Sequence, residues 1–345
     1  MTRPFLQTLT RPDKISFRFF IFIFIFLLML VAPARAIDIE RADIRAFIQE
    51  MQRDHGFDNE QLEGWLSQAE SKPGIIELIS RPAEKVKPWH EYRQIFLTGE
   101  RIRRGQEFYR NNLAAILSAA ETSGVEAEII AAIIGVETYY GDRPGKNRII
   151  DALSTLAFDY PPRQQFFRRE LAKFFELARA QGIDPLIPVG SYAGAMGMPQ
   201  FMPSSYLAYA EDGDGDGRKD IWENIADVTA SVGHYLVHHG WKSEATIAVP
   251  AKVPAELVAA APGKALGLDT SVGQLRAQGV CFDSGRMDDD TAAVLIQLES
   301  ENGPVFWVGF ANFHAITRYN RSRMYAMAVF QLASEINKRQ PADSE

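Results

Sequence analysis

Glu137 is the residue whose position most directly suggests acid–base chemistry. It follows a run, 129–136, that is apolar on every side of a predicted helix. A carboxyl group at the end of such a helix loses solvent, which raises its pKa because the anion is disfavoured. A carboxylic acid that keeps its proton near neutral pH can protonate a glycosidic oxygen. Glu137 is therefore our candidate general acid. By position alone, the alternative is a glutamate that reaches water or caps a neighbouring helix.

A loop rich in glycine, methionine and aromatic residues is a second candidate site. It reads SYAGAMGMPQFMPSS over residues 191–205. Small residues let a backbone approach a ligand closely, and the larger side chains offer stacking surface and amide hydrogen bonds. That mixture suits a pyranose ring and makes Tyr192, Met196, Gln200 and Phe201 candidate sugar contacts. The alternative is a tight turn that packs its methionine and phenylalanine side chains into the core.

An acidic loop is the third candidate site. Asp212, Asp214 and Asp216 alternate with glycine, and Glu223 takes the twelfth position counted from Asp212. This is the spacing of an EF-hand calcium loop, in which position 7 contributes a backbone carbonyl, here that of Arg218. The sequence therefore predicts a structural Ca²⁺ site, and a solvated acidic turn is the alternative.

Helices are the elements that must position these residues. Apolar spacing of three to four residues predicts the helices, and punctuation by glycine and proline predicts where they end. Two short apolar runs predict a β-hairpin, and residues 245–280 resemble a small appended segment. We expect an α+β fold that is mainly α, with helices over 37–51, 58–69, 101–123, 126–140, 161–182, from the acidic loop through 239, and 321–338, and strands over 294–299 and 305–310.

Composition narrows the class of protein. A chain of 345 residues with 46% hydrophobic content can bury a sizeable core. The formal charge of −7 argues against nucleic acid as a partner, because phosphate binding requires a basic surplus. Phosphate-binding glycine loops, kinase signatures and Rossmann fingerprints are absent from the sequence. His234 and His238 lie four residues apart, but no third ligand is evident for zinc.

Residues 1–36 have the layout of a secretory signal peptide. Basic residues precede an apolar run of fourteen residues, 19–32, and a small-x-small cleavage site follows at 34–36. The run is shorter than the roughly 20 residues of a membrane-spanning helix. An uncleaved N-terminal anchor is the alternative. Cleavage removes five basic residues and one acid, so the remaining chain carries a formal charge of −11.

Cysteine usage bears on the compartment. Cys281 is the only cysteine, so the chain forms no internal disulfide, and no cysteine near the cleavage site could carry a lipid. We therefore expect a periplasmic protein that is not a lipoprotein and keeps no membrane span after cleavage.

Four motifs resemble those of the lytic murein transglycosylase B family. They are GVETYYG at 135–141, DALSTL at 151–156, the loop at 191–205 and ITRYN at 316–320, in order along most of residues 39–338. The resemblance implies a lysozyme-like catalytic core over about 90–240 and 305–340, an N-terminal helical part over 37–89 and a small insertion over about 245–304.

The resemblance also implies a reaction. In this family one glutamate, matched by Glu137, protonates the bond between N-acetylmuramic acid and N-acetylglucosamine in peptidoglycan. It then takes a proton from the C6 hydroxyl of the muramic acid, which closes a 1,6-anhydro ring. The 2-acetamido group can assist. Most glycosidases need two carboxylates, and no second acid is obviously paired with Glu137 here. The implied partners are glycan strands, with other cell-wall enzymes as further candidates.

Binding residues carry over one at a time. Ser191 matches a serine that holds the acetamido group or the developing charge, and Gln200 matches a substrate-binding glutamine. The groove's tyrosines and asparagine are matched by Tyr92, Tyr235, Tyr319, Asn320 and Tyr325. For each tyrosine taken alone, burial in the core is the better expectation. The chain departs from its relatives at 160–163, where they often carry a basic pair, and this puts the start of the next helix in doubt.

The last calcium ligand has two candidates. Relatives close their calcium loop with an aspartate that matches Asp227, whereas EF-hand spacing favours Glu223. Asp227 also fits the third position of a helix capped by Asn224. Two further functions are open at this point, a hydrolytic muramidase with the same groove and a non-enzymatic, calcium-stabilised peptidoglycan-binding protein.

Overall fold

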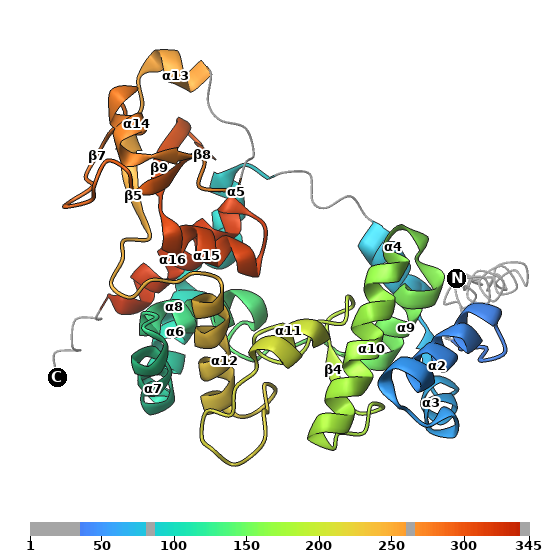
Figure 1. The fold of residues 1–345 in the computed structure, drawn as a ribbon. Coiled ribbons are helices and arrows are strands. Elements are labelled where there is room, and N and C mark those ends of the chain that lie inside the picture. Colours follow the sequence, from blue (N-terminus) through green and yellow to red (C-terminus); the bar gives the residue numbers. More distant parts are fainter. Residues whose placement is uncertain (1–34, 81–86, 260–265, 339–345) are drawn as a thin grey trace, which may run out of the picture. The chain divides into compact units, whose positions relative to one another are not determined.

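The structure is a computed structural model that describes residues 35–80, 87–259 and 266–338 (Figure 1). The described residues from Ala36 onward form one unit by their contacts. The expected signal peptide lies outside the described residues, apart from positions 35 and 36. Within the described ranges, no helix has the length and apolar character needed to cross a membrane.

Helices dominate the described chain. The N-terminal ones are α2 (Ala42–His55), α3 (Asn59–Leu66), α4 (Pro73–Ser80) and α5 (Trp89–Phe96). The middle ones are α6 (Gly99–Asn111), α7 (Leu113–Ser123), α8 (Ala127–Thr138), α9 (Ile149–Asp159), the 3₁₀ turn η1 (Pro161–Arg163), α10 (Gln164–Gln181), α11 (Pro203–Tyr209) and α12 (Ile225–His238). The C-terminal ones are α13 (Ala255–Ala259), α14 (Val272–Ala277), α15 (Ala311–Tyr319) and α16 (Arg323–Asn337).

Strands form small sheets. They are β1 (Arg35–Ala36), β2 (Glu70–Ser71), β3 (Asn147–Arg148), β4 (Val189–Gly190), β5 (Ala248–Lys252), β6 (Thr270–Ser271), β7 (Cys281–Phe282), β8 (Ala292–Ser300) and β9 (Gly303–Gly309). The largest sheet is antiparallel, in the order β6-β8-β9-β5-β7. The predicted hairpin is confirmed as β8–β9, whereas the expected boundary at 304/305 falls inside β9, because the sheet pairs all of that strand.

Helix α8 is a central, buried helix of the fold. Its residues 129–136 are all buried, as the all-round apolar run predicts. It packs against α6, α7, α12 and α16. The helix ends at Thr138, two residues earlier than predicted, because Tyr139 and Tyr140 adopt left-handed backbone angles with φ of 56° and 61°.

The single helix predicted over 101–123 is wrong. Asn112 separates α6 from α7 with φ −118° and ψ 24°, and its side-chain amide donates to the carbonyl of Phe108. Asparagine competes in this way for backbone hydrogen bonds, so a helix that looks continuous by apolar spacing divides there. The end at Gly124, with φ 67°, is confirmed.

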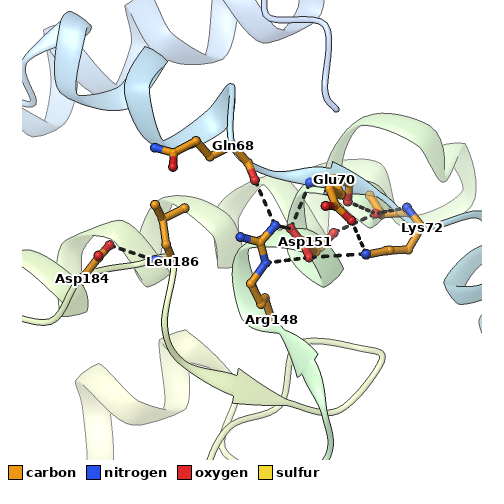
Figure 2. A network of polar contacts seen from close by, with 8 residues as sticks. Gln68, Glu70, Lys72, Arg148, Asp151, Asp184 and Leu186 are labelled. Carbon is orange, nitrogen blue, oxygen red and sulfur yellow. Dashed lines mark hydrogen bonds and ion pairs between the residues drawn. The ribbon is translucent and has the colours of Figure 1, made fainter. Parts of the chain in front are cut away.

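A buried acid joins the N-terminal part to α9. Asp151, in the DALSTL motif, accepts hydrogen bonds from the Arg148 guanidinium at 2.8 and 2.9 Å and from the backbone N–H of Glu70 at 2.9 Å (Figure 2). Arg148 also donates to the carbonyl of Gln68. Asp151 is 2% exposed, so this charge-assisted network has a structural role and connects β2 with the start of α9.

Candidate active site

Glu137 occupies the penultimate position of α8, next to helix α16. Its side chain is partly exposed, although the helix that carries it is buried. The Tyr325 hydroxyl donates a hydrogen bond to Glu137 Oε1 at 2.6 Å. Tyr325 itself is 2% exposed. The packing of α16 against α8 therefore brings together two residues that lie far apart in the sequence.

The environment of Glu137 makes it a weak acid. Burial raises the pKa of Glu137, and the hydrogen bond from Tyr325 partly opposes this shift. The net pKa is about 7. Among the described residues, no second carboxylate contributes to this shift. The carboxyl group therefore keeps its proton to higher pH than an ordinary glutamate, as suits a group that first donates a proton and later accepts one.

Three of the tyrosines expected in the groove form one aromatic cluster. Tyr319 stacks on Tyr325 with ring centroids 6.5 Å apart and lies 4.6 Å from Tyr235. The Tyr319 hydroxyl donates to the carbonyl of Pro199 at 2.7 Å, and the Tyr235 hydroxyl donates to that of Arg318 at 2.7 Å. Tyr235 and Tyr325 are buried, which fits their core alternative, whereas Tyr319 is half-buried. The cluster connects α12, α15 and α16 beside Glu137.

Two residues of the loop at 191–205 that were expected to contact sugar are buried. Met196 is 0% exposed and Phe201 is 2% exposed. Their backbones pair with each other across the turn, with N–H···O distances of 2.8 and 3.0 Å, and Phe201 packs 5.6 Å from Tyr235. The prediction that they contact sugar directly is therefore wrong. The loop's alternative, a tight turn packed on the core, accounts for both.

Other residues of the loop remain accessible. Tyr192 is 40% exposed. Ser191 Oγ, half-buried, accepts from the backbone N–H groups of Ala193 and Ala195. Gln200 adopts φ 53°, and its amide nitrogen donates to the carbonyls of Pro144 and Gly197. No hydrogen bond is seen to the Gln200 Oε1 atom within the described ranges.

The two remaining groove candidates are Tyr92 and Asn320. Tyr92, on α5, is half-buried and stacks on Trp89 with centroids 6.2 Å apart. Its phenol is close enough to Tyr325 to help raise the pKa of that hydroxyl, after burial and the charge of Glu137. Asn320 is exposed at the C-terminal cap of α15.

Thr138 is a positioning residue that pattern reasoning from the sequence missed. Its hydroxyl donates to the carbonyl of Met198 at 3.0 Å and accepts from the backbone N–H of Gly141 at 3.1 Å. It is 0% exposed. Thr138 thus fastens the end of the helix that carries Glu137 to the loop at 191–205. The only signal for it in the sequence is its place inside the GVETYYG motif.

Comparison with known proteins agrees with this geometry. The family model described as the transglycosylase SLT domain matches residues 40–334. The chain belongs to this family.

Its relatives are enzymes of the bacterial cell wall. Membrane-bound lytic murein transglycosylase B from Escherichia coli (strain K12) is 41% identical over 301 residues, which cover 84% of this chain and 81% of that protein. Soluble lytic transglycosylase SltB1 from Pseudomonas aeruginosa is 48% identical, with a TM-score of 0.81 over 84% of this chain and 97% of that one. Slt35 from Escherichia coli, solved with bulgecin A and with calcium, is 39% identical, with a TM-score of 0.80 over 88% and 95%.

The transglycosylase is therefore an enzyme that cleaves peptidoglycan. The predicted fold, α+β and mainly α with a lysozyme-like core, is confirmed. Because the relatives are named as lytic transglycosylases, the alternative of a non-enzymatic binding protein is not supported.

The acidic loop of the transglycosylase brings three carboxylates together. Oxygens of Asp212, Asp214 and Asp227 lie within 4.8 Å of one another. Burial and the charges of Asp214 and Asp212 raise the pKa of Asp227, which is 0% exposed, so a cation would relieve this crowding. Glu223 is exposed and outside the group. The arrangement fits Ca²⁺ and favours the aspartate over the EF-hand glutamate as last ligand.

The two other expected calcium ligands, Asp216 and the carbonyl of Arg218, belong to exposed residues. Asp216 lies outside the group of three and accepts a hydrogen bond from the backbone N–H of Arg218 at 2.8 Å. Asp212 Oδ2 accepts from the backbone N–H of Gly217 at 2.8 Å. These bonds hold the loop in a tight coil around the carboxylates. The coordination by Asp216 and by the Arg218 carbonyl stays a prediction.

Proposed function

We propose that this enzyme is a periplasmic lytic transglycosylase in which Glu137 is the only catalytic carboxylate. It cleaves the β-1,4 bond between N-acetylmuramic acid and N-acetylglucosamine without water. Protonated Glu137 donates its proton to the glycosidic oxygen as the bond from C1 breaks. The resulting carboxylate takes the proton of the C6 hydroxyl while O6 bonds to C1, which closes the 1,6-anhydro ring and restores the acid.

The single observation that carries this proposal is the pKa of about 7 for a carboxyl group without a second carboxylate among the described groups that shift it. Two-carboxylate glycosidases divide the acid and nucleophile roles between residues about 5–9.5 Å apart. One group with a pKa near neutrality can take the acid and base roles in turn, and the hydrogen bond from Tyr325 is suited to stabilise the intermediate carboxylate.

The binding residues of the proposal are those that geometry leaves accessible. Stacking surface comes from Tyr92, Tyr192 and Tyr319. Asn320 offers its amide and Ser191 its hydroxyl oxygen. Gln200 offers its amide oxygen, which accepts no hydrogen bond from a described residue. Tyr325 and Tyr235 act as positioning residues. Asp212, Asp214 and Asp227 would hold a structural Ca²⁺, which supplies charge neutralisation to the loop when bound. Calcium in Slt35 and bulgecin A in the same relative support these assignments.

Replacement of Glu137 tests the proposal. Glu137→Gln removes the proton donor but keeps the shape, so turnover of purified sacculi should fall about 10²–10⁴-fold, the usual share of a general acid–base. The matched control is Glu126→Gln. Glu126 lies at the other end of α8, and burial also raises its pKa. Equal rates for parent and Glu137→Gln would overturn the assignment, whereas the control should keep parental turnover.

A further inference from the structure

Three arginine side chains surround the ring of Tyr139, two residues after Glu137. The guanidinium carbons of Arg101, Arg104 and Arg143 lie 4.5, 5.0 and 4.6 Å from the ring centroid. We refer to Tyr139 and these three arginines as the arginine cluster. Arg101 and Arg104 come from α6, whereas Arg143 belongs to the loop that follows α8.

Positive charge in the arginine cluster exceeds negative charge. Arg104 pairs with Asp142. Arg101 is only 7% exposed, donates to the carbonyl of Gly135 at 2.7 Å and has no ion pair with any described residue. Its Nε atom is buried without a hydrogen-bond partner in the described ranges. Arg143 is exposed, and it too makes no ion pair there.

Local structure explains only part of this arrangement. The carbonyls at the end of α8 and the rings of Phe96 and Tyr139 stabilise a cation, which accounts for Arg101. The ring of Tyr139 also attracts the exposed guanidinium of Arg143, but it leaves the charge of Arg143 without a negative partner among the described residues. Buried or crowded cations normally require an anion. In a chain with formal charge −7, this concentration of cations is suited to an anionic ligand.

The arginine cluster is continuous with the proposed glycan site. Arg101 lies 5.2 Å from the ring of Phe96, which lies 5.3 Å from that of Tyr92, and Tyr92 neighbours the hydroxyl of Tyr325 that binds Glu137.

The loop of Arg143 is also fastened to the loop at 191–205. Gln200 donates to the carbonyl of Pro144. A side chain at Gly145 would lie 2.0 Å from the carbonyl oxygen of Gly190, so the two backbones are in close contact there. Arg143 is thereby held between these two attachments and Tyr139.

We propose that the arginine cluster binds carboxylate groups of the peptide stem on the muramic acid. This inference rests on the proposed function, because the stem hangs from the sugar whose C1 bond Glu137 would break. The stem is a short peptide with free carboxyl groups, and guanidinium groups bind carboxylates through paired N–H···O bonds. Arg143 provides the accessible charge, and the ring of Tyr139 fixes its position.

Binding of a soluble disaccharide–peptide fragment tests this directly. The fragment is titrated against Glu137→Gln protein, which prevents turnover, with and without Arg143→Glu. A second titration uses the same fragment with its carboxyl groups amidated. We expect Arg143→Glu to weaken binding of the acid form about tenfold or more, the value of a charge-assisted contact, and to affect the amidated form much less.

Arg103→Glu is the matched control. Arg103 is exposed, as Arg143 is, but it lies on α6 and pairs with Glu100 and Glu107. Arg103→Glu should change neither the affinity for the acid fragment nor that for the amidated fragment. Equal losses for acid and amidated fragments, or no loss for either, would overturn the proposal. Arg143→Ala, with melting curves for each variant, guards against misfolding. The binding assay does not depend on turnover, and continued cleavage by Glu137→Gln would reveal a failure of the proposed function separately.

Discussion

At the scale of single residues, the account depends on how one carboxyl group is kept protonated. Desolvation at the end of α8 raises the pKa of Glu137, and one phenol opposes that shift. The protonated form is the reactive one, so kcat/KM should be constant below pH 7 and fall as the pH rises through about 7. Two residues far apart in sequence therefore set the pH range of the enzyme together.

Tyr325→Phe changes this balance in a predictable direction. The hydrogen bond that stabilises the Glu137 anion is lost, so the pKa of Glu137 rises and the alkaline limb of the kcat/KM profile moves to higher pH. The maximal rate should fall as well, because the carboxyl group loses its orientation. A pH profile measures both effects.

Tyr206→Phe is a suitable control for this change. Tyr206 is equally buried, but its hydroxyl donates to the carbonyl of Lys219, away from Glu137. The alkaline limb of this variant should match the parent. A limb that moves to lower pH in Tyr325→Phe, or stays in place, would contradict the role given to the phenol.

At the scale of elements, the end of α8 and the loop at 191–205 must be held together. Thr138 makes this connection through Met198 and Gly141. Two successive tyrosines in left-handed conformation turn the chain immediately after it. Such a turn is unfavourable for bulky residues, and it persists here because surrounding contacts determine it.

Thr138→Val tests this connection. Valine has nearly the same shape but leaves a buried carbonyl and N–H unsatisfied, so unfolding free energy should fall by about 1–3 kcal/mol. Turnover should fall too, since Glu137 would be less well oriented. Thr122→Val is the control, because the Thr122 hydroxyl makes one exposed bond, to the carbonyl of Ser118. Chemical denaturation and kinetics that show the same small effect for both variants would argue against the connection.

At the scale of the whole molecule, a chain without disulfides would gain stability from a cation. A ligand that binds only the folded state at 100 times its Kd adds about 2.7 kcal/mol. Added Ca²⁺ should therefore raise the melting temperature, and a chelator should lower it.

The two candidate ligands respond differently in this test. Asp227→Asn should abolish the response to Ca²⁺, because Asp227 lies in the carboxylate group, whereas Glu223→Gln should keep it. The measured quantity is the shift on adding Ca²⁺, not the melting temperature itself, since Asp227 also accepts hydrogen bonds from Gly213 and Asp220. The opposite pattern would restore EF-hand spacing as the better guide.

The sequence predicted those features that local patterns determine. The all-round apolar run before Glu137 predicted a buried helix and a perturbed acid, and two short apolar runs predicted the β8–β9 hairpin. The helix break at Asn112 was missed because apolar spacing continues across it. The sequence also could not decide which side chains of the loop at 191–205 are exposed, because long-range packing buries Met196 and Phe201. Family resemblance placed Tyr325 in the groove, but its hydrogen bond to Glu137 was not predicted, because no local pattern links α8 to α16.

The most direct test of the central claim is the mass of the products. Residues 37–345 are incubated with purified sacculi, and the released fragments are analysed by mass spectrometry beside those of Glu137→Gln and Glu126→Gln. We expect 1,6-anhydro muropeptides from the parent and from Glu126→Gln, and essentially none from Glu137→Gln. Fragments one water heavier with reducing ends, or anhydro products from Glu137→Gln at the parental rate, would contradict a non-hydrolytic cleavage by this single glutamate.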